Sequence, residues 1–228
     1  MSTRIYSTEY KTPLPHKILD ALLANLPPDV AAKARRYRLW QDTYGCVFGK
    51  LLLIHALQEQ GHTTDLRTIL YTDYGRPYLP DTPDFNISHS AHRVVCAITD
   101  TGRIGIDLEE IRGLNIEDFK DQFTPEEWQT ITHAPAPLHA FYHFWTAKEC
   151  LSKADGRGLN LPLASLAITP DKTIRLHDRP WQLHTITSFS GYACHIATEN
   201  PADELFIEDI PLNELSISVL ENHRNYPT

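Results

Sequence analysis

Apolar residues recur at helical spacing in two long stretches of the chain. The first stretch follows Asp42, which can cap a helix, and ends at Gly61, which favours a stop. Its apolar positions are Val47, Phe48, Leu51, Leu52 and Ile54. The second stretch, residues 138–154, ends before Gly156. Spacings of three and four residues place one apolar stripe on each helix, so both helices are expected to pack on a core.

A third helix is predicted to begin at Thr124. Thr124 can cap it, Pro125 suits the first helical position, and Glu127 can complete a capping box. Further upstream, residues 73–83 are rich in turn-forming residues, which predicts a long and functional loop.

Short apolar runs with β-branched and aromatic residues predict strands. These runs span residues 5–10, 85–88, 94–99, 104–108, 165–169, 181–187, 192–198 and 205–207. Residues 100–103 have the composition of a hairpin turn, so the strands on either side of them are expected to pair. The strands after residue 160 are expected to be antiparallel.

This order of elements predicts an α+β fold with two similar halves. A strand, a helix and strands precede residue 105, and helices and strands follow it. We expect an N-terminal half at residues 1–104 and a C-terminal half at residues 105–228. No low-complexity segment separates them, so their interface is expected to be extensive.

Composition narrows the class of protein. The 228 residues are 42% hydrophobic and 22% charged, which is typical of a chain with its own core. The longest apolar runs are too short to span a bilayer, and the N-terminal residues lack a signal-peptide stretch, so we expect a cytoplasmic protein without a membrane partner. A formal net charge of -8 argues against nucleic-acid binding.

The four cysteines form no Cys-x-x-Cys pair, so buried reduced thiols are expected rather than a zinc or dithiol site. One basic segment, residues 33–38, interrupts this acidic chain. It suits a compact anionic ligand, and a solvated helix face explains it equally well.

Asp107 and Glu109 form the sharpest candidate pair for chemistry. They are two residues apart on an expected strand and therefore project from one face. Adjacent carboxylates repel unless a cation lies between them, and Mg²⁺ prefers a few carboxylate oxygens with waters and substrate phosphates. The alternative is a charged strand end that faces water.

Two further segments carry polar groups that could join such a site. Glu149 and Lys153 are one helical turn apart and share a stripe, although a surface ion pair explains that spacing at least as well. Ser88 and His89 end an apolar strand with groups that can donate to a phosphate. A lone histidine in that position is more often structural.

Four motifs occur together in the order and spacing of a known family. They are Gly75-Arg76-Pro77, Phe85-Asn86-Ile87-Ser88-His89-Ser90, Gly105-Ile106-Asp107-Leu108-Glu109 and Trp145-Thr146-Ala147-Lys148-Glu149-Cys150-Leu151-Ser152-Lys153. Together they resemble the 4'-phosphopantetheinyl transferase superfamily, in its longer, surfactin-synthetase-activating branch. The resemblance implies two pseudo-symmetric α/β subdomains in one chain, with the active site in the cleft between them.

The resemblance also implies an activity and its residues. The chain would transfer the 4'-phosphopantetheine group of coenzyme A to a serine of an apo acyl or peptidyl carrier protein, releasing adenosine 3',5'-bisphosphate. Asp107, Glu109 and Glu149 would bind Mg²⁺, for which Mn²⁺ could substitute. Glu149, directly or through a metal-bound water, would take the serine proton, with Glu127 as the second choice. Lys153 would stabilise or protonate the leaving group.

Other positions match the family's contacts with coenzyme A. The expected contacts are Lys33, Arg36, Gly75, Arg76, Pro77, Ser88, His89 and Lys148. Lys33 and His89 match positions that hold the 3'-phosphate, and residues 75–77 match the loop beside the adenine. Lys148 is expected to contact phosphate.

Three positions depart from the family pattern. Val30 stands where a second lysine is usual, and Gly45 and Cys46 stand where an arginine and a hydroxyl are usual. These departures predict a weaker 3'-phosphate pocket, for which Arg36 or Arg38 is expected to compensate.

Two other functions stay open. One is a noncatalytic relative that binds coenzyme A or a carrier protein, and the other is a metal-dependent phosphohydrolase of small nucleotides. Fatty-acid, polyketide and nonribosomal-peptide carriers are all candidate partners, and a chain that completes its own cleft is expected to be a monomer.

Overall fold

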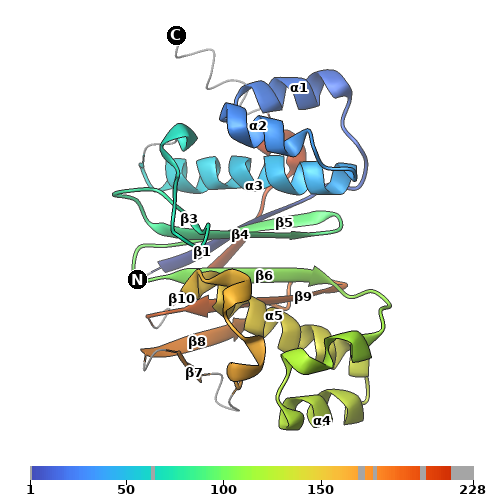
Figure 1. Cartoon of the computed structure of the whole chain (residues 1–228). Helices are drawn as coiled ribbons and strands as arrows, with labels where there is room; N and C mark the ends of the chain where they lie inside the picture. The colour runs from blue at the N-terminus through green and yellow to red at the C-terminus, as the bar shows by residue number, and fades with distance from the viewer. Residues whose placement is uncertain (1, 63–64, 169–172, 177–178, 201–203, 217–228) are drawn as a thin grey trace.

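The computed structural model describes residues 2–62, 65–168, 173–176, 179–200 and 204–216. Within them, two four-stranded sheets face each other between two layers of helices (Figure 1). The helices on the first sheet are α1 (His16–Ala24), α2 (Pro28–Ala34) and α3 (Trp40–Glu59), and those on the second are α4 (Pro125–His133) and α5 (Pro137–Asp155). The prediction of an α+β fold is confirmed. Among the described helices, none is long and apolar enough to cross a membrane.

The first sheet has the strand order β10-β1-β5-β4. Its strands are β1 (Ser2–Glu9), β4 (Asp84–Ser90), β5 (Arg93–Thr99) and β10 (Glu204–Asp209). β1 and β4 are antiparallel to β5, while β10 runs parallel to β1. Phe48, Leu51 and Leu52 of α3 are fully buried against this sheet, as their helical spacing predicts.

The second sheet has the order β6-β9-β8-β7, and its neighbouring strands are antiparallel. Its strands are β6 (Ile104–Glu110), β7 (Thr173–Leu176), β8 (Arg179–Thr185) and β9 (Tyr192–Thr198). α5 lies across β6 and β9. Gly105 permits this close approach, because a Cβ atom there would lie 2.0 Å from the carbonyl oxygen of Cys150.

Short elements complete the described fold. β2 (Leu70–Tyr71) and β3 (Pro77–Tyr78) form a two-stranded sheet around a tight loop. The 3₁₀ helices are η1 (Leu66–Thr68), η2 (Ile116–Gln122), η3 (Gly158–Asn160) and η4 (Leu163–Ser165). α4 begins with the predicted capping box, in which the Thr124 and Glu127 side chains each accept from the other residue's backbone N–H.

The two sheets are joined along a seam between the edge strands β4 and β6. Four backbone N–H groups of β6 have no partner in their own sheet on this side, and each donates to a side-chain oxygen of β4. The pairs are Ile104 N to Asp84 Oδ2 at 2.9 Å, Ile106 N to Asn86 Oδ1 at 2.9 Å, Leu108 N to Ser88 Oγ at 3.2 Å and Glu110 N to Ser90 Oγ at 3.1 Å. The alternating polar residues of β4 therefore satisfy an otherwise open sheet edge.

Three sequence predictions about this fold are wrong in part. Residues 100–103 reverse the chain but form no hairpin, because β5 and β6 belong to different sheets and β6 pairs with β9. In the predicted strand 165–169, residues 165–168 form no strand, since the carbonyls of Leu163 and Leu166 turn toward the buried ammonium of Lys148 instead, and Thr169 lies outside the described residues. α3 starts two residues before Asp42, with Leu39 at its N-cap.

β10 also differs from the prediction, because it pairs parallel to β1 rather than with the strands of the C-terminal half. Ile210 and Leu215, which follow it, are buried in the core beneath α1–α3. Residues 204–216 thus lie with the N-terminal half, although the expected boundary assigns them to residues 105–228. The boundary at residue 104 stays a prediction.

Candidate active site

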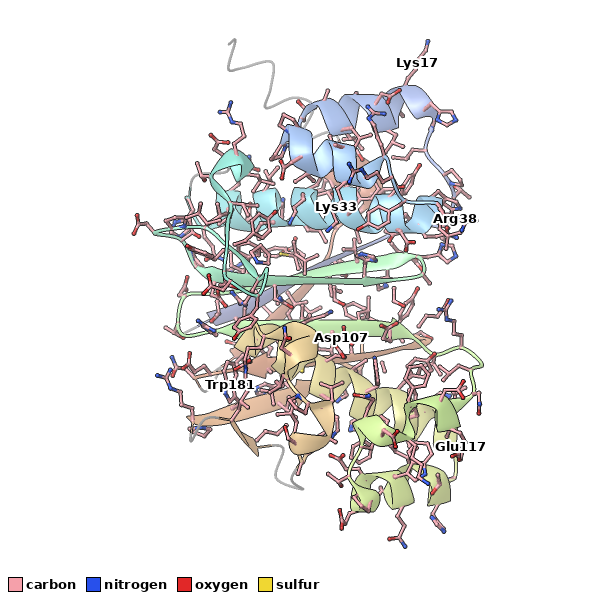
Figure 2. All side chains as sticks on the ribbon, in the orientation of Figure 1. Lys17, Lys33, Arg38, Asp107, Glu117 and Trp181 are labelled. Atoms are coloured by element: carbon pink, nitrogen blue, oxygen red, sulfur yellow. The ribbon has the colours of Figure 1, made fainter. Side chains whose placement is uncertain are left out.

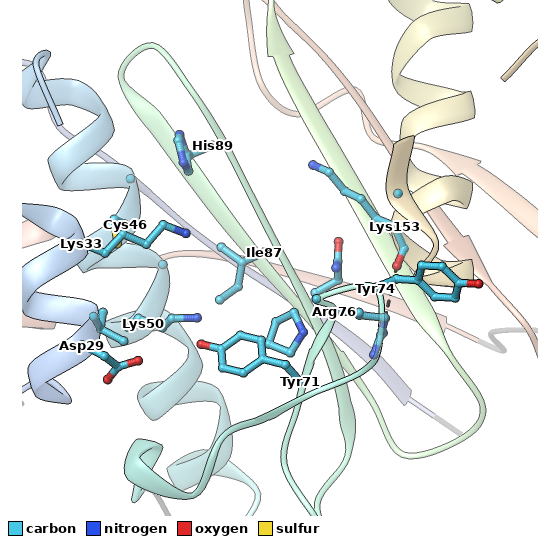
Figure 3. A pocket seen from close by; sticks show the side chains of 18 of the residues that line it. Asp29, Lys33, Cys46, Lys50, Tyr71, Tyr74, Arg76, Ile87, His89 and Lys153 are labelled. Atoms are coloured by element: carbon cyan, nitrogen blue, oxygen red, sulfur yellow. Dashed lines mark hydrogen bonds between the residues drawn. The ribbon is translucent and has the colours of Figure 1, made fainter. Parts of the chain in front are cut away.

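A cavity of about 400 Å³ lies between the two halves. Its walls come from α2 and α3 on one side and from the β2–β3 loop, β4 and the C-terminal end of α5 on the other. Three lysines line it: Lys33, Lys50 and Lys153. Figure 3 shows Lys33 and Lys50 on one wall and Lys153 on the opposite wall, so the cavity is positively charged at both ends.

Lys153 connects this cavity to a buried carboxylate on β6. Its ammonium donates to Asp107 Oδ1 at 2.5 Å and to Ser88 Oγ at 2.8 Å, and Ser88 Oγ in turn donates to Asp107 Oδ1 at 3.0 Å. Asp107 is only 3% exposed, and no described residue donates to its other oxygen, Oδ2. A buried carboxylate oxygen without a partner is costly, so it marks a position where a ligand would be stabilised.

Glu109 and Glu149 lie close enough to Asp107 to repel it. Burial, and then the charge of Asp107, raise the pKa of both glutamates above the ordinary value, while Lys153 opposes this rise. Glu109 also accepts from Ser90 Oγ at 2.8 Å. Burial alone would lower the pKa of Lys153, but Asp107, Glu149 and Glu109 together raise it, so this lysine stays charged.

The chemistry of these three carboxylates fits a divalent cation such as Mg²⁺. A cation would relieve their mutual repulsion and supply a partner for Asp107 Oδ2. Among the described residues, however, no three His, Cys, Asp or Glu side chains are already grouped as the ligands of a metal ion. Lys153 occupies Oδ1 of Asp107, which leaves Oδ2 as the oxygen open to a cation.

Lys148 and Glu127 lie away from the cavity and contact each other. Lys148 is completely buried, and its ammonium contacts Glu127 at 2.7 Å and the carbonyls of Leu163 and Leu166 at 2.8 and 2.9 Å. The other oxygen of Glu127 accepts from the Ile168 N–H at 3.1 Å. Neither side chain lines the cavity, and both groups are paired within the C-terminal half. A phosphate contact for Lys148 and a second base in Glu127 stay predictions.

Arg76 belongs to the loop that the resemblance places beside the adenine, and its contact with coenzyme A stays a prediction. It lines the cavity together with Gly75 and Pro77, but its guanidinium is buried and paired with Asp84 at 2.9 and 2.6 Å. It also donates to the carbonyls of Lys153 and Ile104. Arg76 therefore holds the β2–β3 loop against both halves, and its donors are not free for a phosphate.

His89 and Lys33 line the cavity as expected, whereas Arg36 and Arg38 are exposed and do not. Burial lowers the pKa of His89. The ring of His89 lies over Gly45, where an added Cβ would be 2.4 Å from the ring carbon Cγ. The glycine at position 45 thus makes room for the imidazole. In Figure 2, Lys33 and Asp107 lie near the middle of the molecule, while Arg38 lies at its edge.

Sequence reasoning missed Lys50. This residue follows Cys46 by one helical turn on α3, and both line the cavity. Their spacing of four residues was the available signal, since it places them on the same face as Gly45 and Gly49.

All four cysteines are free thiols, and Cys96, Cys150 and Cys194 are buried, as expected from their spacing.

Comparison with known proteins identifies the family. The sequence profile of the 4'-phosphopantetheinyl transferase superfamily matches residues 103–197. The chain is 30% identical over 221 residues to the 4'-phosphopantetheinyl transferase Sfp of Bacillus subtilis strain 168, covering 92% of this chain and 96% of that protein. It is 31% identical to the 4'-phosphopantetheinyl transferase HetI of Nostoc sp. over 74% of this chain and 76% of HetI. The chain belongs to the 4'-phosphopantetheinyl transferase superfamily.

Proposed function

We propose that this protein transfers the 4'-phosphopantetheine group of coenzyme A to a serine of an apo carrier protein. The observation that carries the proposal is the cavity between the halves, which has lysines at both ends and adjoins the buried Asp107 through Lys153. A nucleotide with two separate phosphate groups matches this distribution of charge. The superfamily of the chain supports the same reaction.

In the reaction, a bond forms between the serine oxygen and the phosphorus that carries the pantetheine arm. The bond from that phosphorus to the oxygen shared with the nucleotide breaks, and adenosine 3',5'-bisphosphate leaves. Asp107, Glu109 and Glu149 would hold Mg²⁺, which offsets charge on the diphosphate when bound. Glu149, whose pKa is raised by burial and then by Asp107, is the proposed acceptor of the serine proton. Lys153 would stabilise the new charge on the leaving phosphate.

We further propose that Mn²⁺ can replace Mg²⁺ and that the enzyme acts as a cytoplasmic monomer. Both walls of the cavity come from one chain, so the site does not need a second subunit. Fatty-acid, polyketide and nonribosomal-peptide carriers all present a serine of the required kind. One carrier of each class is therefore needed to test the proposal.

The intact mass of a purified apo carrier after incubation with the enzyme, coenzyme A and Mg²⁺ tests the proposal. We expect a gain of one phosphopantetheine, lost on chelation and reduced at least about 100-fold in rate in Asp107→Asn. Glu117→Gln, which removes an exposed acid far from the cavity (Figure 2), should react like the wild type.

The alternative functions give different results in the same assay. No mass gain with any carrier, together with measurable binding of coenzyme A, would favour a noncatalytic relative. Release of inorganic phosphate without a carrier would favour a phosphohydrolase.

A further inference from the structure

Lys50 is a cation in the cavity that the family resemblance does not account for. Its side chain extends from α3 into the cavity beside Lys33, as Figure 3 shows. No hydrogen bond or ion pair joins its ammonium to any of the described residues. Burial lowers the pKa of Lys50, and Lys33 adds to this effect, while Cys46, Cys96 and, least of the three, Asp29 oppose it. A partly buried ammonium without a partner is most stable when an anion binds beside it.

The other cations near the cavity cannot take this role. The guanidinium of Arg76 is already paired with Asp84. Arg36 and Arg38, which were expected to compensate for the missing basic residues, are exposed and do not line the cavity. The lowered pKa of His89 favours a neutral ring. Lys33 and Lys50 are thus the two cations of this wall.

Coenzyme A has two charged groups, a diphosphate and a 3'-phosphomonoester on the ribose. The reacting diphosphate must lie at the Lys153 end of the cavity, because Asp107 pairs with Lys153 there and the charges of Glu109 and Glu149 also act on this lysine. The phosphomonoester then has the opposite wall, where Lys33 and Lys50 project. We propose that Lys50, together with Lys33, binds the 3'-phosphate of coenzyme A and lets this enzyme discriminate against dephospho-coenzyme A. This inference rests on the proposed function for the identity of the ligand.

Gly45 explains why a basic side chain from another position of α3 is needed on this wall. The small residue at position 45 admits the ring of His89, so a long basic side chain at that position would have to displace the imidazole. Lys50 is on the next turn of the same helix and reaches the same cavity. Lys50 therefore supplies positive charge to this wall from a position one helical turn after Cys46 on α3.

Isothermal titration of coenzyme A and dephospho-coenzyme A into the intact protein tests the role of Lys50. We expect Lys50→Met to weaken coenzyme A binding by about 10- to 100-fold and to change dephospho-coenzyme A binding less than about twofold. Lys50→Arg should retain most of the discrimination. Arg38→Met, which removes a nearby exposed charge outside the cavity, is the matched control and should affect neither ligand.

The outcomes separate this inference from the proposed function. Equal weakening of both ligands in Lys50→Met, or no weakening of coenzyme A, would overturn the role of Lys50 even if the wild type modifies carriers. Conversely, a discrimination that depends on Lys50 in a protein that modifies no carrier would refute only the transfer reaction. Thermal melting of each variant checks that the fold is intact.

Discussion

Burial of Glu149 suits its proposed role as a proton acceptor but lowers the stability of the fold. Burial, and then Asp107, raise its pKa, so the folded protein without metal binds the Glu149 proton more tightly than the unfolded chain does. Ionisation of Glu149 therefore destabilises the fold above its folded pKa. This destabilisation disappears below the ordinary glutamate pKa of about 4.3.

Glu149→Gln should consequently stabilise the metal-free protein at neutral pH by about 0.5–2 kcal/mol while abolishing transfer to the carrier. Urea unfolding in the presence of a chelator, measured from pH 4 to pH 8 in roughly unit steps, would show the gain appear as the pH rises. Glu117→Gln is the control for an exposed glutamate and should change little. A loss of stability at neutral pH would show that Glu149 makes a structural contact instead.

For individual residues, local periodicity predicted which side chains share a face of a helix or strand, but not which side chains from different elements contact each other. The period of two brought Asp107 and Glu109 to one side of β6, and the helical period brought Glu149 and Lys153 to one stripe of α5. Lys148 lies next to Glu149 in sequence, yet its partner is Glu127 of another helix. Only the packing of α4 on α5 creates that pair, so no local pattern could reveal it.

Among the elements, the close packing of α5 on β6 depends on Gly105. Gly105 is where the helix backbone comes closest to the strand, since an added Cβ would lie 2.0 Å from the carbonyl oxygen of Cys150 and 2.6 Å from the Ala154 nitrogen. Both contacts are with backbone, which cannot move away as a flexible side chain can. α5 carries Glu149 and Lys153, so any displacement would also disturb the site.

Gly105→Ala should therefore destabilise the protein by about 1–3 kcal/mol or more and lower the rate of transfer. Gly113→Ala is the matched control, because nothing lies within 4 Å of an added Cβ there. Urea unfolding and the carrier assay, run in parallel on both variants, measure the two effects. If Gly105→Ala has wild-type stability and rate, α5 does not need this close contact.

Strong periodic patterns predicted the ranges of the helices and strands well, but they could not predict which strands pair with each other. α3, α5 and β9 occur within two residues of their predicted ranges, because long amphipathic patterns and β-branched runs are local properties. The partner of β6 was predicted wrongly from the turn residues at 100–103. What decides it is apolar burial: Ile104, Ile106 and Leu108 all pack in the core between the two sheets.

In the whole molecule, the described part of the chain crosses between the halves twice. It leaves the first sheet after β5 and returns with β10, which lies beside β1. Ile210 then fills the core under α1–α3, and its N–H donates to the Ser7 carbonyl at 2.8 Å. The seam between β4 and β6 adds four hydrogen bonds across the interface. The first half is incomplete without β10, and the second half depends on β4 to satisfy the open edge of β6, which predicts that the halves unfold together.

Ile210→Ala tests this coupling, because the residue belongs to the C-terminal part of the sequence but to the core of the N-terminal half. We expect a loss of about 2–5 kcal/mol, since the buried side chain leaves a cavity. Hydrogen exchange should show equal losses of protection for the amides of β5 and β9, which lie in different sheets. Ile207→Ala, on β10 and 41% exposed, is the control and should change the free energy of unfolding and the hydrogen exchange little.

A loss of protection confined to β5 would contradict the coupling and would support independently stable halves. An equal loss of hydrogen-exchange protection in β5 and β9, as expected, has a consequence for the active site. Asp107 and Lys153 belong to the second half, while Lys33 and Lys50 belong to the first, so the cavity between them keeps its shape only while both halves are folded. Cooperative unfolding would then ensure that the two ends of the coenzyme A site are present or absent together.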